Sequence, residues 1–347
     1  MAGKRYVVAQ AGLGMRGKVH VDGILGNADR LELAAVCDLQ DGPIGWARDE
    51  RGITRAYKDA ERMLDEVRPD VFVFVTRPDV RLEMVRLAAK YGVRGLAFEK
   101  PMATSLRDAR EMTRICEAEG IKAVVSHQQK YLTSLQRLKA AVDSGAIGEV
   151  DQINFSAASN MSGIGTHFMD YAMWVNGGRR VKWAVGHIHG KKGLSTWGHH
   201  PAADYVMGQA EFEGGVRLFL ECGTSSRRRM AANRGSFDNR LSVYGTEGFA
   251  WAETDGAFCI CSGGVTERGQ DASFLEQERN LQTLYFKDLA DWLDDGSKAH
   301  PCNIGISYHG YEVLEGICVS SLERRPVEFP VDPEAMPDVL EKIAELL

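Results

Sequence analysis

Close to its start the chain reads Gly12-Leu13-Gly14-Met15-Arg16-Gly17, and this stretch decides the fold. A short apolar run, residues 6–9, precedes the glycines, and an apolar segment that ends in an acid, residues 31–38, follows them. This order is typical of a strand, a glycine turn, a helix and a second strand. The sequence therefore predicts an N-terminal α/β domain that is built on a parallel sheet.

The spacing of the three glycines also predicts a dinucleotide site. Gly12 permits the tight turn, Gly14 lets the backbone approach a pyrophosphate, and Gly17 lets the helix pack closely on the strand. The N–H groups at the start of the helix then face the phosphates. Asp38 lies 21 residues after Gly17, where a carboxylate can bind both ribose hydroxyls and repel the 2′-phosphate of NADP. We expect NAD rather than NADP; the alternative for Asp38 is a solvated acid at a strand end.

Composition narrows the class of protein. A length of 347 residues favours two domains, and a net charge of −6 gives no indication of nucleic-acid binding. Seven scattered cysteines, an odd number, favour thiols in a reducing compartment over a disulfide framework or a metal site. The apolar run at residues 71–75 is too short to span a bilayer, and no leader peptide is visible. We expect a cytoplasmic protein with no membrane partner and no metal.

The character of the sequence changes near residue 126. Residues 1–125 alternate strands with helices, which predicts a Rossmann dinucleotide-binding domain. Residues 126–332 carry mainly β-rich runs with turn signals, which predict an α+β domain with an open, mainly antiparallel sheet. Residues 333–347 predict a helical tail. Strands are expected at 5–10, 33–38, 71–76, 95–98, 122–126, 150–157, 182–189, 205–213, 216–221, 241–244 and 257–261, and helices at 59–67, 80–91, 105–119, 132–143, 278–294 and about 308–322.

Several further motifs occur in a fixed order along the chain. They are Glu99-Lys100-Pro101, residues 144–149, residues 165–170 with Trp174, residues 212–215 and residues 244–248. Together with the glycine turn, this set resembles the glucose–fructose oxidoreductase / inositol dehydrogenase (Gfo/Idh/MocA) family from about residue 5 to about residue 330. The resemblance implies NAD(P)-dependent redox chemistry on sugars, polyols or similar ligands.

The resemblance also implies roles for individual residues. Lys100 matches the catalytic lysine of the family, and His167 matches its catalytic histidine. Histidine titrates near neutral pH and suits a base that removes a hydroxyl proton, while a lysine stabilises the developing alkoxide. The alternative for His167 is a structural role at the start of its helix. The expected cofactor-binding residues are Gly12, Gly14, Met15, Arg16, Gly17, Asp38, Thr76, Glu99 and Lys100, and the expected substrate-binding residues are Lys100, His127, Lys130, His167 and Asp170.

The sequence departs from the family pattern in two places. Many members carry an acid four residues before the histidine, where this chain has Gly163. Asp170 lies one helical turn after His167 and could take that role, bind substrate hydroxyls or serve the fold. Members often carry a histidine where this chain has Arg81, for which we favour a surface position over a site for an anionic substrate.

Three functions remain open from the sequence. The first is an NAD-dependent dehydrogenase acting on a secondary alcohol of a sugar, sugar acid or cyclic polyol. The second is a redox-neutral glycosidase that works through a transient keto-sugar, and the third is a non-enzymatic dinucleotide- or sugar-sensing protein. The resemblance further implies a homodimer or homotetramer that forms through the open face of the second-domain sheet.

Overall fold

The computed structural model describes residues 5–189, 195–197, 200–203, 205–223, 226, 238–336, 339, 342 and 345. The chain divides into two compact units, and both are discontinuous in sequence. The first unit contains residues 1–104, 108–128 and 278–305. The second contains residues 105–107, 129–277 and 306–347.

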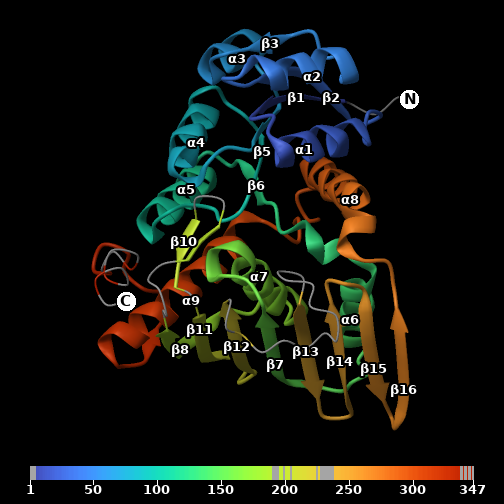
Figure 1. The fold of residues 1–347 in the computed structure, drawn as a ribbon, viewed down its shortest axis with the longest axis vertical. Helices are drawn as coiled ribbons and strands as arrows, with labels where there is room; N and C mark the ends of the chain where they lie inside the picture. Colours follow the sequence, from blue (N-terminus) through green and yellow to red (C-terminus); the bar gives the residue numbers. More distant parts are fainter. Residues whose placement is uncertain are drawn as a thin grey trace. The chain divides into compact units, whose positions relative to one another are not determined.

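The first unit is built on a six-stranded parallel sheet in the order β3-β2-β1-β4-β5-β6. In Figure 1, helices α4 and α5 lie on one side of this sheet, and α1 and α8 lie on the other. The strands are β1 (Tyr6–Ala11), β2 (Leu31–Cys37), β3 (Ala56–Tyr57), β4 (Val71–Phe74), β5 (Gly95–Phe98) and β6 (Lys122–Val125). The helices are α1 (Met15–Leu25), α2 (Asp41–Arg51), α3 (Ala60–Val67), α4 (Arg81–Lys90), α5 (Leu106–Ala118) and α8 (Phe274–Asp294).

The central strands of this sheet are fully buried, as their sequence predicts. All four residues of β4 and all four of β5 are inaccessible to solvent, which is typical of parallel strands covered on both faces. The carboxyl ends of β1, β4 and β5 lie at one edge of the sheet. Ligands bind at this edge in doubly wound folds, so it is the place to look for a site.

Helix α8 differs from the expected arrangement, because the sequence analysis assigned residues 278–294 to the second domain. Most of the helix packs within the first unit instead, against α1, where a side chain at Gly23 would collide with Gln282. Asn27 fixes this contact by donating from Nδ2 to the carbonyl oxygen of Thr283 at 2.9 Å. The sequence predicted a helix at residues 278–294 but held no information on which sheet it covers.

The second unit is built on a nine-stranded sheet in the order β16-β15-β14-β13-β7-β12-β11-β8-β17. Its pairs are antiparallel except for the parallel pair β7–β12, so the expected fold class is confirmed. The strands are β7 (Val150–Ala157), β8 (Val181–His189), β11 (Tyr205–Phe212), β12 (Arg217–Gly223), β13 (Asn239–Gly245), β14 (Gly248–Glu253), β15 (Ala257–Ser262), β16 (Val265–Gln270) and β17 (Val327–Glu328). A separate two-stranded ribbon pairs β9 (Ser195–Trp197) with β10 (His200–Ala202).

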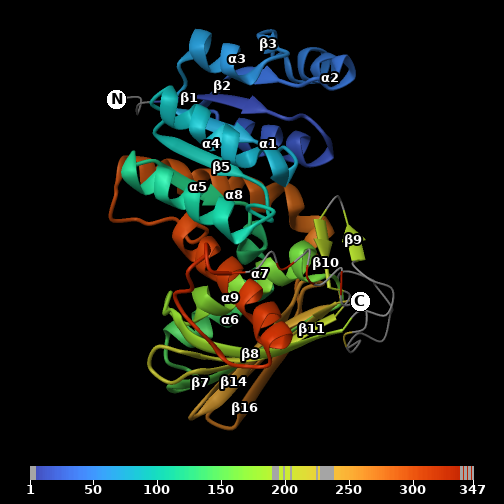
Figure 2. The same ribbon diagram turned by 90° about the vertical axis from the view of Figure 1, so that its left-hand side faces the viewer.

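Three helices of the second unit lie on the same face of the nine-stranded sheet, as Figure 2 shows. They are α6 (Thr133–Asp143), α7 (Thr166–Val175) and α9 (Ile304–Glu323). Ile317 of α9 packs directly over Gly186 of β8 and Gly208 of β11. On the opposite face, strand residues such as Met207, Phe219 and Tyr244 are exposed.

Several short elements were not expected from the sequence. Strand β16 is exposed at every residue, so it shows no alternation of apolar and polar positions. Helix α2 begins with Asp41-Gly42-Pro43, which resembles a turn, although proline is tolerated in a first helical turn. Strands β3, β14 and β17 were also missed. Most of the expected tail at 333–347 lies outside the described residues.

None of the seven cysteines forms a disulfide bond, and six of them are buried. This confirms the expectation that they are thiols and do not form a disulfide framework. In the described part of the chain, no helix is long and apolar enough to cross a membrane.

Candidate active site

The glycine turn between β1 and α1 is held by the side chain of Gln10. Its Nε2 donates to the carbonyl oxygens of Gly12 at 3.0 Å and Gly17 at 2.8 Å. Gly12 has a φ of +89°, and a Cβ there would lie 2.4 Å from the carbonyl oxygen of Val75. A Cβ at Gly17 would lie 2.2 Å from the carbonyl oxygen of Gly12. Both positions therefore need glycine for the protein's own packing.

Gly14 is different, because a Cβ there would meet no protein atom within 4 Å. It is the N-cap of α1, and no side chain of the described residues caps the helix. The space above Gly14 and the uncapped helix start fit the pyrophosphate of a dinucleotide, which needs close access to backbone N–H groups. Thr76 Oγ1 is buried, and no hydrogen-bond partner is found for it among the described residues.

Asp38 is tied to the same turn. Its Oδ2 accepts from the backbone N–H of Leu13 at 2.7 Å, and its Oδ1 accepts from the N–H of Gln40 at 2.9 Å. These two bonds fix the plane of the carboxylate at the end of β2. A carboxylate has further acceptor positions for ribose hydroxyls, so the residues present fit the expected NAD.

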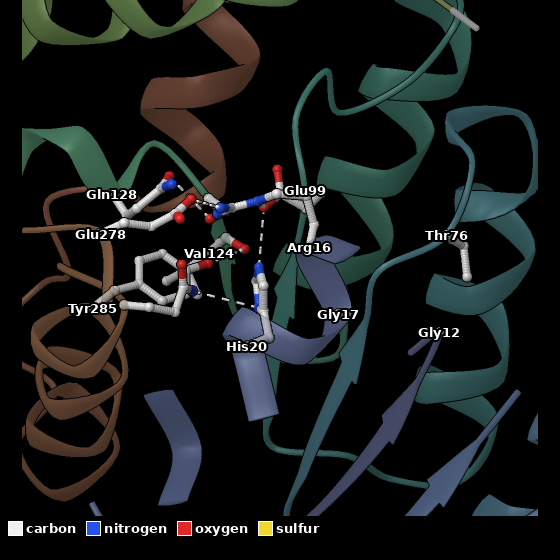
Figure 3. Close-up of polar contacts among 12 residues, drawn as sticks. Gly12, Arg16, Gly17, His20, Thr76, Glu99, Val124, Gln128, Glu278 and Tyr285 are labelled. Atoms are coloured by element: carbon white, nitrogen blue, oxygen red, sulfur yellow. Dashed lines mark hydrogen bonds and ion pairs between the residues drawn. The ribbon is translucent and has the colours of Figure 1, made fainter. Parts of the chain in front are cut away.

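Glu99 occupies the centre of a buried polar cluster at the end of β5, shown in Figure 3. Arg16 Nε lies 3.0 Å from Glu99 Oε1, and Arg16 Nη1 lies 2.5 Å from Glu278 Oε1. His20 Nε2 lies 3.1 Å from the same oxygen of Glu99. Burial alone raises the pKa of Glu99, but Arg16 and His20 outweigh it and hold that pKa well below its usual value. The carboxylate of Glu99 is therefore engaged by the protein itself.

His20 was not expected in the cluster. It is fully buried, and burial lowers its pKa below the ordinary value of 6.5, although Glu99 opposes the shift. A neutral ring that donates from Nε2 to Glu99 keeps its lone pair at Nδ1, which faces Gln282 Nε2 at 3.4 Å. The one available sequence signal was its position, one helical turn after Arg16 on α1.

Lys100 follows Glu99 at the edge of the sheet and is partly buried. Burial lowers its pKa to about 8; Glu99 opposes this shift, whereas the nearby cations Arg16 and Arg81 reinforce it. A lysine with this pKa changes charge close to physiological pH. It can therefore donate a hydrogen bond as an ammonium and also exchange a proton.

Arg81 corrects the expectation of a surface position. It is 2% exposed and donates to three backbone carbonyl groups in the first unit. The acceptors are provided by Thr76, Glu99 and Pro101. Arg81 is therefore not available to an anionic substrate. Arg77, in contrast, is exposed and pairs with Asp79 at 3.1 Å.

In the second unit, His167 lies in the first turn of α7. One turn of π-helix, Met161–Gly165, runs directly into this helix, and the side chain of Asn160 caps it by accepting from Gly163 N at 2.7 Å. Such turns occur frequently at functional sites. Gly163, the position at which relatives often carry an acid, thus belongs to this irregular turn.

Tyr171 is a hydrogen-bond partner of His167 that the sequence analysis did not identify. The Tyr171 hydroxyl lies 2.8 Å from His167 Nδ1 and 3.2 Å from Gln129 Oε1. If the hydroxyl donates its single proton to Gln129, its oxygen accepts from His167 Nδ1–H. A neutral ring in this tautomer carries its lone pair at Nε2.

Lys130 and Asp170 form a buried ion pair, and both are fully inaccessible to solvent. Ser307 donates to Asp170 Oδ2 at 3.2 Å, and the Lys130 ammonium lies 5.9 Å from the centre of the Trp174 ring. These contacts engage two of the five expected substrate-binding residues with each other. Asp170, which lies in the same helix as His167, is therefore an ion-pair partner of Lys130.

The expected site residues are divided between the two units. The first contains the glycine turn, Asp38, Thr76, Glu99, Lys100 and the buried His127, and the second contains Lys130, His167 and Asp170. Within the described residues, no group of three or more His, Cys, Asp or Glu side chains is arranged to hold a metal ion.

Known proteins resemble this chain in both sequence and fold. A family model for an oxidoreductase family with an NAD-binding Rossmann fold matches residues 5–127, and a model for a GFO/IDH/MocA C-terminal domain matches residues 158–250. The chain is 32% identical to a D-apiose dehydrogenase from Paraburkholderia graminis over 42% of this chain, and it spans 38% of that relative's length. It is 21% identical to a myo-inositol 2-dehydrogenase from Thermotoga maritima over 84% of this chain and 88% of the relative.

Among solved structures, the chain resembles an oxidoreductase from Agrobacterium radiobacter that was crystallised with NAD+, L-tartaric acid and magnesium. The TM-score is 0.78 at 20% identity, and the match covers 94% of this chain and 98% of the other. This likeness supports the same two-part fold.

Proposed function

The chain belongs to the Gfo/Idh/MocA oxidoreductase family, and from that premise we propose that it is a dehydrogenase of a secondary alcohol in a sugar, sugar acid or cyclic polyol. The expected cofactor, NAD, is confirmed by the family model and agrees with the fixed carboxylate of Asp38. The substrate class follows the relatives, which are named for D-apiose and myo-inositol.

The observation that carries the proposal is the setting of Lys100. Its neighbour Glu99 is locked by Arg16 and His20, and Arg81 binds the backbone on both sides of the lysine. The ammonium of Lys100, carried on this fixed backbone, would bind the reacting oxygen of the substrate and stabilise negative charge on it. Fixed donors of this kind favour catalysis because they need no reorganisation during the reaction.

His167 is proposed as the base that removes the hydroxyl proton. Its Nδ1 is held by Tyr171, and the lone pair at Nε2 then accepts the proton. NAD+, held at Gly14 and Asp38, would supply the acceptor for the hydride that the alcohol carbon loses. The proton on His167 completes the balance, and the product is a ketone, or a lactone where the oxidised carbon is the hemiacetal carbon of a cyclic sugar.

The test follows NADH absorbance when purified protein meets NAD+ and a panel of D-apiose, myo-inositol, L-tartrate and methyl β-D-glucoside. A rise with one class that is lost in both Lys100→Ala and His167→Ala supports the proposal. Binding of NAD+ without any rise contradicts it. Release of methanol from the glucoside without NADH would indicate the redox-neutral glycosidase instead.

Two further parts of the proposal concern assembly and location. We infer a homodimer or homotetramer that buries the open sheet face with Met207, Phe219 and Tyr244, because exposed apolar side chains gather on these strands. Sedimentation velocity of the wild type and Phe219→Glu tests this inference, which fails if both are monomers. We also propose a cytoplasmic location, supported by the seven free thiols and testable by cell fractionation.

A further inference from the structure

The guanidinium of Arg81 is fully buried and lies beside the turn formed by Glu99, Lys100 and Pro101. In the described part of the chain its hydrogen-bond acceptors are all backbone carbonyl oxygens. Nη1 donates to the carbonyl of Glu99 at 2.5 Å and also to that of Pro101, the residues directly before and after Lys100. Nε and Nη2 donate to the carbonyl of Thr76 at 3.2 and 2.6 Å.

These four hydrogen bonds join the ends of two neighbouring strands. Thr76 follows β4, and residues 99–101 follow β5, so the guanidinium links the ends of adjacent strands at the ligand edge of the sheet. A planar fork with five N–H groups can reach several acceptors at once, which a lysine ammonium or an imidazole at this position cannot match.

Burying a guanidinium without a contacting carboxylate is costly. Burial lowers the pKa of Arg81 to about 10, a shift that Glu99 and Asp79 oppose, so the side chain stays charged at neutral pH. A neutral donor would satisfy part of the same backbone at lower cost. The charge of Arg81 also acts on Lys100, whose pKa it lowers together with burial and Arg16.

We propose that Arg81 is a positioning residue for Lys100: it brackets the lysine through the two flanking carbonyl groups and ties this turn to Thr76. The inference rests on the proposed role of Lys100. It predicts two separable effects, a geometric effect from the forked donors and an electrostatic effect from the charge. Glu99 and Arg16 are further charged groups among the described residues that act on Lys100.

The first experiment needs no turnover. Amines are labelled with a trace of acetic anhydride at a series of pH values from 6.5 to 10, and peptide mass spectrometry measures how much each lysine reacts. The pH dependence of labelling gives the titration midpoint of Lys100, and the exposed Lys58 and Lys298 serve as internal references. In the wild type we expect a midpoint of about 8. In Arg81→Met the midpoint should move to higher pH, because a nearby cation is lost. An unchanged midpoint in a folded variant overturns the proposal.

The second experiment separates geometry from charge. Arg81→Lys keeps the cation but loses the fork, so we expect the labelling midpoint to stay near the wild-type value. Turnover of myo-inositol, or of whichever panel compound reacts, should fall on the order of 10²-fold, with little change in the KM for NAD+. Wild-type kcat in this variant overturns the bracketing role. The lysine variant also keeps the proposal testable if Arg81→Met fails to fold.

The matched control is Arg86→Met on the same helix, because Arg86 is exposed and its carboxylate contact, Glu83, is 3.7 Å away. It should leave both labelling and turnover unchanged. If the wild type shows no dehydrogenase activity, the proposed function fails, but the labelling result still decides whether Arg81 acts on Lys100.

Discussion

The hydroxyl oxygen of Tyr171 lies 2.8 Å from Nδ1 of His167, one turn along the same helix. Relatives often pair this histidine with an acid placed four residues before it, and here that position is Gly163. A tyrosine four residues after the histidine makes the contact instead. The imidazole is therefore oriented by a neutral oxygen, which fixes the ring without adding negative charge beside it.

Replacing Tyr171 with Phe removes the hydroxyl and leaves the ring in place. We expect kcat to fall about tenfold, the cost of one buried hydrogen bond, with the KM for NAD+ unchanged. Tyr6→Phe is the control, because it also removes a hydroxyl contact, the part-buried hydrogen bond of 2.6 Å to Asp294, which lies in the other unit from Tyr171. Equal kcat losses in both variants would show that Tyr171 has only a structural role.

The Lys130–Asp170 pair predicts strong coupling in stability. Removing one partner leaves a buried charge unpaired, so Lys130→Met and Asp170→Asn should each lower the free energy of unfolding by about 3–5 kcal/mol. The double variant should lose clearly less than the sum, since neither charge remains. Urea denaturation of the four proteins measures this coupling. Purely additive losses would mean that the ion pair does not form in solution.

Gly14 and Gly17 form a matched pair for testing the dinucleotide site. Gly17→Ala places a methyl group 2.2 Å from the Gly12 carbonyl oxygen and should lower the melting temperature. Gly14→Ala meets no protein atom within 4 Å, so the fold should remain stable while the methyl group blocks the pyrophosphate. We expect NAD+ affinity, measured by calorimetry, to drop at least tenfold in Gly14→Ala. Normal NAD+ binding by this variant would place the phosphates elsewhere.

His20 predicts a pH dependence of stability. Its pKa is lowered in the folded protein, so the unfolded chain binds the proton more readily. Stability should therefore fall as pH drops below about 6.5, the unfolded value, and level off above it. In His20→Gln, which can still donate to Glu99, this slope between pH 5 and 7 should diminish. Thermal melts across that range give the comparison, and identical slopes would contradict the assignment. Glu99 titrates at lower pH and does not interfere.

The glycine turn could be predicted from the sequence because its information is local. The spacing of Gly12, Gly14 and Gly17 specifies the turn, and Asp38 ends the next strand at a fixed distance. The hydrogen bonds of Arg81 could not be predicted, because their acceptors at Glu99 and Pro101 follow β5 and are distant from Arg81 in the sequence. In the sequence, an arginine directly after Pro78-Asp79-Val80 resembles a surface residue. Its buried setting becomes visible only in the structure, where the end of β5 lies beside it.

Tyr171 was missed for a related reason. An aromatic residue four positions from another ring, on a helix that is buried almost throughout, resembles ordinary core packing. Only the position of Gln129 and the rotation of the His167 ring show that the hydroxyl has a polar role. Lys130 and Asp170 could be identified as residues of interest, but the sequence held no sign that they bind each other.

The first unit is interrupted in the chain, and this has a consequence for biosynthesis. Helix α8 contributes Glu278 to the Arg16 cluster and Asp294 to the Tyr6 hydroxyl, yet it is translated after residues 129–277. A ribosome therefore releases β1 to β6 long before the helix that completes their packing. The surface of α1 at Gly23 therefore stays uncovered during synthesis, because α8, which packs on it, emerges only when most of the polypeptide has been made.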